Sequence, residues 1–217
     1  MRAVWSLVVV GAALVTGASG CGRSGYQYVE NDDLGVYARV PGDWAVYDEA
    51  DLFPDVSERE LESRRTNLWV RTFDAAADPS VEASQSPGDV HPTGIMVMRA
   101  LGSQERDALN VSTMRGGGNP ARDPVMMESA GVTEDGTQVQ VLVDEPVTFE
   151  GDYSGVHTVF VMSRGDRTVV FDRTAVRNAE TTALAVFEVS CSEDCYFETH
   201  QDEIADLVDS WTIQEVQ

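Results

Sequence analysis

Lysine is absent from this chain of 217 residues, and all 15 of its basic residues are arginine. Its 37 acidic residues give it a formal net charge of −22. Without lysine the chain has no side-chain amine for Schiff-base chemistry and no lysine for a phosphate-binding P-loop. The charge excludes a nucleic-acid-binding protein, because a phosphate backbone would be repelled, and it excludes a polybasic membrane patch.

A long hydrophobic run is also lacking. The apolar stretch over residues 3–15 has about 13 residues, whereas a helix that spans a bilayer needs about 20. Arg2 precedes this stretch, and the small or polar residues 16–20 follow it. This order is typical of a secretory signal with a cleavage site. Residues 1–20 are therefore predicted to be a signal peptide rather than a transmembrane anchor.

The residues at the expected cleavage site indicate a lipid anchor. Ala18-Ser19-Gly20-Cys21 resembles a bacterial lipobox, in which the cysteine thiol accepts the lipid and becomes the new N-terminus. Two or three acyl chains anchor a protein stably. We expect Cys21 to be the lipid-attachment residue and residues 21–30 to be a tether of at most about 30 Å. The alternative is an ordinary secretory signal cleaved beside Cys21, which leaves an unmodified thiol.

Cysteine is otherwise scarce. Cys191 and Cys195 remain as an even pair, and export places them in an oxidising compartment. In a helical or turn conformation their i, i+4 spacing brings the Cα atoms to about 6 Å, which predicts a disulfide. The spacing lacks the C-x-x-C of redox proteins, and no second ligand pair completes a zinc site.

The sequence contains no assembled catalytic motif. His91, His157 and His200 lack metal-binding spacing and are more typical of structural or solvated histidines. Residues 151–155 lack the G-x-S-x-G pattern of a nucleophilic serine, and the glycines of residues 115–118 are typical of a flexible turn. We therefore expect no catalytic residue, no cofactor and no metal site.

Hydrophobic periodicity predicts one α+β domain with a mainly antiparallel sheet. Strands are expected over residues 34–40, 44–47, 67–73, 93–99, 139–143, 153–162, 168–172 and 184–189. A turn at residues 41–43 joins the first two. One short helix, which Pro54 and Asp55 open, is expected within residues 53–65. Another helix is expected over residues 105–114, and residues 74–91 are expected to be a long loop. A final helix is expected to carry an apolar stripe that consists of Phe197, Ile204, Leu207, Val208 and Trp211.

Two segments of the chain resemble a known family. The segment from Leu34 to Trp44, LGVYARVPGDW, resembles the opening hairpin of Mog1/PsbP-like proteins. The segment from Cys191 to Ile213 resembles the end of actinobacterial envelope lipoproteins of the same fold. The resemblance implies an α/β/α sandwich over residues 31–214. Its better-known members bind proteins, a small GTPase for Mog1 and a photosystem for PsbP, and the family offers no catalytic residues to assign.

These features favour a lipid-anchored, non-enzymatic accessory protein on the extracytoplasmic face of the cell membrane, which binds another envelope component. The first alternative is a carrier or sensor for an apolar small molecule or lipid. Its pocket would be lined by tryptophan and methionine residues that are otherwise expected in the core: Trp44, Trp69, Trp211, Met96, Met98, Met126 and Met127. The second alternative is a hydrolase whose site forms only in three dimensions.

Overall fold

The computed structural model describes residues 25–65, 67–116, 131–132 and 136–214. The predicted signal peptide and Cys21 lie outside these described residues, as do Met126 and Met127. The predictions that fall on them are therefore not tested by the structure.

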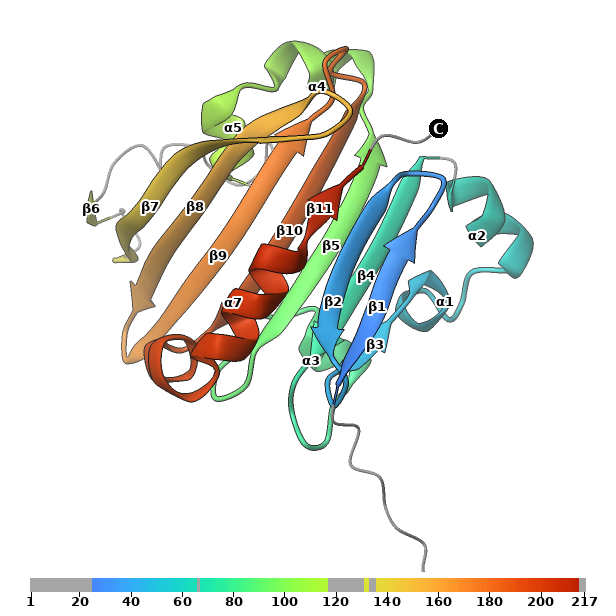
Figure 1. Cartoon of the computed structure of the whole chain (residues 1–217). Coiled ribbons are helices and arrows are strands. Elements are labelled where there is room, and N and C mark those ends of the chain that lie inside the picture. The colour runs from blue at the N-terminus through green and yellow to red at the C-terminus, as the bar shows by residue number, and fades with distance from the viewer. Residues whose placement is uncertain (1–24, 66, 117–130, 133–135, 215–217) are drawn as a thin grey trace, which may run out of the picture.

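A large antiparallel sheet forms the centre of the molecule (Figure 1). Its strand order is β3-β4-β5-β10-β9-β8-β7-β6, and every neighbouring pair is antiparallel. The strands are β3 (Ala45–Tyr47), β4 (Leu68–Asp74), β5 (Thr93–Ala100), β6 (Gly131–Val132), β7 (Gln138–Phe149), β8 (Tyr153–Arg164), β9 (Arg167–Arg177) and β10 (Ala183–Cys191). The expected mainly antiparallel α+β architecture is confirmed.

A second, three-stranded sheet has the order β1-β2-β11 and contains β1 (Tyr26–Asn31), β2 (Val36–Pro41) and β11 (Thr212–Ile213). This sheet corrects two expectations. The returning strand expected at residues 44–47 does not pair with β2, because it is β3 and pairs with β4 in the large sheet. The tether expected over residues 21–30 is shorter, because the backbone of residues 26–30 is already paired with β2.

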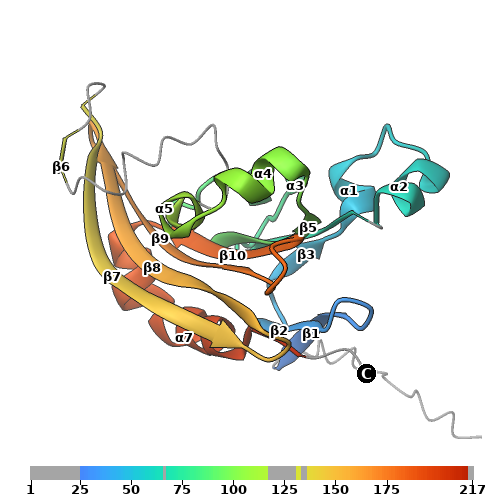
Figure 2. The same ribbon diagram turned by 90° about the horizontal axis from the view of Figure 1, so that it is seen from above.

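Helices cover both faces of the large sheet (Figure 2). One face carries α4 (Ser103–Ala108) and α5 (Val111–Arg115), and the other carries α7 (Gln201–Ser210) beside the small sheet. The remaining elements are α1 (Glu49–Leu52), α2 (Glu58–Arg65), α3 (Val81–Ser84) and a π-helical turn at Cys195–Thr199.

The helix boundaries differ from the expected ones for local reasons. The single helix expected over residues 105–114 is divided into α4 and α5, because Asn110 leaves the helical conformation and its side chain caps α5 at the amide of Thr113. The helix expected over residues 53–65 begins only at Glu58, and α1 precedes it. The loop expected over residues 74–91 contains α3, which begins at the capping side chain of Ser80.

The main core lies between the large sheet and the layer formed by α7 and the small sheet. Ile204, Leu207 and Trp211 are buried, as expected for the apolar stripe of the last helix, but Phe197, which was expected in the same stripe, is 39% exposed and lies before α7. The tryptophans and methionines considered as a ligand pocket are part of this core wherever they are described: Trp44, Trp69, Trp211, Met96 and Met98 are at most 5% exposed. They fill space between the layers instead of lining a cavity.

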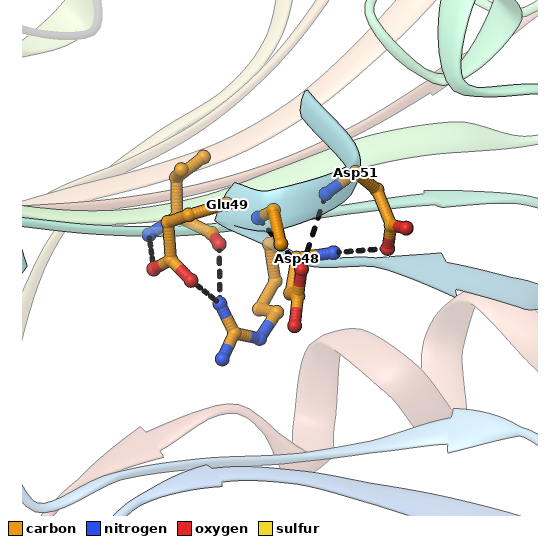
Figure 3. Close-up of polar contacts among 6 residues, drawn as sticks. Asp48, Glu49 and Asp51 are labelled. Atoms are coloured by element: carbon orange, nitrogen blue, oxygen red, sulfur yellow. Dashed lines mark hydrogen bonds and ion pairs between the residues drawn. The ribbon is translucent and has the colours of Figure 1, made fainter. Parts of the chain in front are cut away.

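Glu49 takes the place of a missing strand at one edge of the large sheet (Figure 3). Strand β3 pairs only with residues 72–74 of β4. In the described residues, no strand pairs with the remainder of β4 on this side. The Glu49 carboxylate, at the first turn of α1, accepts a 3.0 Å hydrogen bond from the amide of Val70. Its other oxygen accepts a 2.5 Å bond from the guanidinium of Arg71, which also donates to the carbonyl of Val70. Glu49 and Arg71 therefore satisfy the backbone amide and carbonyl of Val70 at the open edge of β4.

Candidate functional site

Cys191 and Cys195 lie at disulfide-bonding distance, with Cα atoms 5.9 Å apart. Cys191 is the last residue of β10, and Cys195 begins the π-helical turn that leads into α7. Both side chains are buried in the main core. The pair therefore fixes the path of the chain from the sheet into its last helix and acts structurally.

The outer face of the small sheet carries a group of aromatic side chains, here called the tyrosine face: Tyr26, Tyr28 and Tyr37 together with Arg39. Side chains alternate between the two faces of a strand. Val29, Val36, Ala38 and Val40 point into the main core, so the residues between them point outward. Tyr26 is 43% exposed and Tyr28 is 62% exposed. Two large aromatic side chains thus lie open to solvent on neighbouring positions of one surface.

Contacts among these side chains hold the face in one arrangement. The rings of Tyr28 and Tyr37 stack with centroids 5.8 Å apart. The guanidinium of Arg39 lies 5.1 Å from the ring centre of Tyr26, within cation–π range. The Tyr26 hydroxyl donates a 2.5 Å hydrogen bond to Asp206 of α7, and this bond raises the pKa of Tyr26. The tyrosine face is therefore ordered before any partner arrives.

The tyrosine face lies close in sequence to the predicted lipid anchor. Tyr26 follows Cys21 by five residues, a reach of at most roughly 18 Å for an extended chain. Carboxylates surround the face: Glu30 on β1, Asp32 and Asp33 in the following turn, and Asp206 on α7. The surface combines exposed aromatic rings with local negative charge.

A second polar group joins the large sheet to the turn after β10. The buried carboxylate of Asp172 accepts a 2.5 Å hydrogen bond from the Tyr196 hydroxyl and lies 2.8 Å from Nε2 of His157. Nδ1 of His157 lies 3.3 Å from Glu145. The hydrogen bond to Asp172 is the largest cause of the raised pKa of His157, and burial is the largest cause of the raised pKa of Tyr196. Both shifts favour the protonated forms of His157 and Tyr196.

Sequence reasoning missed this network. It treated His157 as an isolated strand residue and did not single out Asp172 or Tyr196. One signal was available. Asp172 lies on the same face of its strand as Val170 and Thr174, which are buried, and a buried carboxylate requires hydrogen-bonding partners.

His91 and His200 also lie together, although they are 109 positions apart in the sequence. Their ring centres are 6.0 Å apart, and His200 lies edge-on to Trp44 at 6.5 Å. Nδ1 of His200 lies 2.6 Å from Glu203. Within the described ranges no group of three or more histidine, cysteine or acidic side chains is arranged to hold a metal ion.

A hollow of about 440 Å³ lies where the β8–β9 hairpin approaches the disulfide turn. Its lining is polar and consists of Asp89, Asp166, Arg167, Thr168, Ser192, Glu193 and Asp194. Arg167 donates a hydrogen bond to the carbonyl of Pro87. This bond holds the hairpin against the loop that precedes β5. The tripeptide Arg164-Gly165-Asp166 forms the turn of this hairpin, with Gly165 in the left-handed region (φ 64°).

None of the helices in the part of the chain that the structure describes is long and apolar enough to cross a bilayer.

No family model and no curated protein matches the sequence. Solved structures do show similarity over most of the chain. Cyanobacterial PsbP (CyanoP) from Synechocystis sp. PCC 6803 has a TM-score of 0.48 at 16% identity, and the match covers 92% of this chain and 98% of that one. LpqN, described as involved in cell envelope biogenesis of Mycobacterium tuberculosis, has a TM-score of 0.45 at 14% identity, covering 88% and 91%.

The Ran-binding protein Mog1p of Saccharomyces cerevisiae has a TM-score of 0.43 at 10% identity, and the match covers 87% of this chain and 95% of that one. PsbP and Mog1 are the proteins whose family the opening segment resembles. All three scores lie below 0.5, so the likeness carries no argument about what this chain does. The α+β class rests on the strand order of this chain itself.

Proposed function

We propose that this protein is a lipid-anchored, extracytoplasmic accessory protein that binds another cell-envelope protein through its tyrosine face. The observation that carries the proposal is the position of this face. Two exposed tyrosines, Tyr26 and Tyr28, lie on the first strand after the predicted anchor. The short tether would hold this face near the membrane, within reach of a partner in or on the same membrane.

The chemistry of the face suits a protein partner. Tyrosine and arginine are enriched at the centres of protein interfaces, where large rigid rings bury much surface at little cost in side-chain entropy. Tyr28 and Tyr37 are already stacked, and Arg39 is already placed over Tyr26. Little ordering is therefore required on binding.

The proposed role is not catalytic, and no cofactor is part of it. A general base needs a nitrogen or oxygen that is free to accept a proton. Both ring nitrogens of His157 face carboxylates, and its pKa is raised, which favours the charged ring. Nδ1 of His200 faces Glu203. The contacts of His157 therefore favour a structural role for this residue over the hydrolase alternative.

The carrier alternative requires a pocket with apolar walls. The side chains expected to form those walls lie in the packed core wherever they are described, and the hollow beside the disulfide turn is lined by charged and polar groups. These observations favour the binding surface over the carrier.

Photo-cross-linking in the native membrane tests the proposal. A photoreactive amino acid at Tyr28, which is 62% exposed, is expected to trap a defined second polypeptide. The matched control is the same group at Val90, which is 66% exposed and lies outside the small sheet. Equal cross-linking from both positions, or adducts from Val90 alone, would remove the tyrosine face from the account.

A further inference from the structure

The edge strands of the two sheets in the described residues are protected from pairing with another strand in different ways. An exposed edge presents unpaired backbone groups and invites another strand, and proteins blunt such edges with short strands, charges, proline or bulges. The edge strands β3, β6 and β11 have three, two and two residues. Beyond β3 the open part of β4 is capped by Glu49.

The long outer edge of β7 is blunted as well. A β-bulge interrupts its register between Val141 and Val143. Pro146 removes a backbone donor from the same strand, and Asp144 and Glu145 add charge beside it. These are the devices that discourage strand addition.

Strand β1 carries fewer such devices. Its six residues pair with β2 in unbroken register, and Glu30 is the one charged residue among them. The strand contains neither proline nor a register shift. Among the described residues, no strand pairs with the outer edge of β1.

The hydrogen bonds around β1 reveal which backbone groups point outward. The carbonyl of Gly25 accepts from the amide of Gly42, so Gly25 faces β2. Backbone groups alternate in direction along a strand, so Gln27 and Val29 also face β2. The groups of Tyr26, Tyr28 and Glu30 therefore face the open edge. The amide of Arg39, opposite Tyr28, points to Ser210 on the far side of β2, as this alternation requires.

The same three residues also present their side chains on the tyrosine face. A strand added at this edge would place its own outward side chains beside Tyr28 and Glu30. Arg39 shows that a guanidinium fits over a tyrosine ring of this face. Glu30, Asp32, Asp33 and Asp206 supply negative charge around it, and the whole chain carries −22. The charge complementarity favours a cationic occupant.

We propose that the partner adds an extended segment to β1 as a fourth strand of the small sheet, with arginine or lysine at alternate positions over Tyr28 and Glu30. This inference rests on the proposed function and names the way in which that partner binds. The main-chain ladder supplies affinity, and the alternate cations supply specificity. A second copy of this chain fits less well, because it brings its own Glu30 and the same net charge.

Hydrogen–deuterium exchange on the full-length protein in detergent tests this inference. The probe is a synthetic hexapeptide with alternating arginine and valine and blocked ends. We expect the amides of Tyr26, Tyr28 and Glu30 to exchange at least tenfold more slowly when the peptide is bound. The amides of Gln27 and Val29 are already bonded to β2 and are expected to change little. Protection that lacks this alternation contradicts strand addition.

Matched peptides and variants separate the backbone from the side chains. A peptide with N-methyl groups on alternate residues loses its backbone hydrogen bonds to β1 and is expected to bind at least tenfold more weakly. A peptide with glutamate in place of arginine loses the complementary charge and is also expected to bind at least tenfold more weakly. Tyr28→Pro removes the backbone amide of residue 28, which faces the open edge and is not bonded to β2. Tyr28→Thr retains this amide. Equal peptide binding by these two folded variants would overturn the inference.

The outcomes distinguish this inference from the proposed function. Cross-links from Tyr28 without protection of the β1 amides would leave the tyrosine face in place and remove strand addition. A dimer of the protein that forms through β1 and blocks the peptide would replace the cationic partner by a second copy. That result would also overturn the inference.

Discussion

The hydroxyl of Tyr196 lies 2.5 Å from the carboxylate of Asp172, although the two residues belong to different layers of the structure. Tyr196 lies in the π-helical turn that follows the disulfide-forming Cys191, and Asp172 lies at the centre of β9. His157 binds the other oxygen of the same carboxylate at 2.8 Å. One buried carboxylate therefore connects the turn before α7 to two strands of the large sheet.

This arrangement predicts a dependence of stability on pH. The bonds to Asp172 and Glu145 raise the pKa of His157 above its unfolded value of about 6.5. The charged ring therefore stabilises the folded state fully below about pH 6.5, and this contribution is lost as the pH rises through the raised pKa. The difference in melting temperature between the native protein and His157→Gln is expected to be largest below about pH 6.5 and to shrink as the pH rises above it.

The two carboxylates should contribute unequally to this effect. Asp172 is buried, whereas the Glu145 side chain is 62% exposed and its contact is longer. Asp172→Asn is therefore expected to remove most of the pH dependence that His157 gives to the melting temperature. Glu145→Gln is expected to remove only a small part of it. A His157→Gln difference that does not change with pH would show that folding does not raise the pKa of His157.

Glu49 provides a prediction about the sheet edge. Glu49→Ala removes the acceptor of the Val70 amide and one of the two acceptors of the Arg71 guanidinium in a largely buried place. We expect a loss of about 2–3 kcal/mol in the free energy of unfolding, measured by urea denaturation. The control is Glu60→Ala, which removes an exposed ion pair with Arg64 and should cost about 0.5 kcal/mol or less. Equal losses in the two variants would contradict the capping role of Glu49.

The cysteine pair predicts a response to reducing agents. Closing a five-residue loop stabilises the fold by roughly 2 kcal/mol in the chain-entropy model. The melting temperature of the native protein should fall when reductant is added, whereas the Cys191→Ala/Cys195→Ala variant should already have the lower value and not change. Alkylation of both thiols without prior reduction would disprove the bond.

Local patterns in the sequence predicted some elements and missed others. Strand β5 and helix α7 were predicted because their signals are local: β5 is a short run that is apolar on both faces, and Ile204 and Leu207 share a helical face. The turn after Pro41 was predicted, but a turn does not determine which strands pair. Strand β2 pairs with β1 and β11 instead of with β3.

The candidate site was harder to predict for a physical reason. Its residues come together only through contacts between distant segments. Tyr26 and Asp206 are 180 positions apart, and no sequence motif connects them. Strand β1 itself has a single buried residue, Val29, because the small sheet covers the core with one face only. Its alternation of tyrosines was therefore taken for part of the tether.

The lipid anchor leads to a separate prediction. Cys21→Ser removes the thiol that accepts the lipid, so the protein should move from the membrane fraction to the culture medium. Immunoblots of both fractions measure the change. Retention of the variant in the membrane would disprove the anchor, and secretion of the unmodified native protein would indicate an ordinary signal peptide.

Native mass spectrometry after mild extraction from the membrane tests the central claim most directly. The account predicts that the native protein retains a discrete second polypeptide, and that a folded Tyr26→Ser/Tyr28→Ser variant loses it. A bound mass of lipid size beyond the Cys21 modification, present in both proteins, would instead favour the carrier. That result, or a partner that both proteins retain equally, would contradict binding through the tyrosine face.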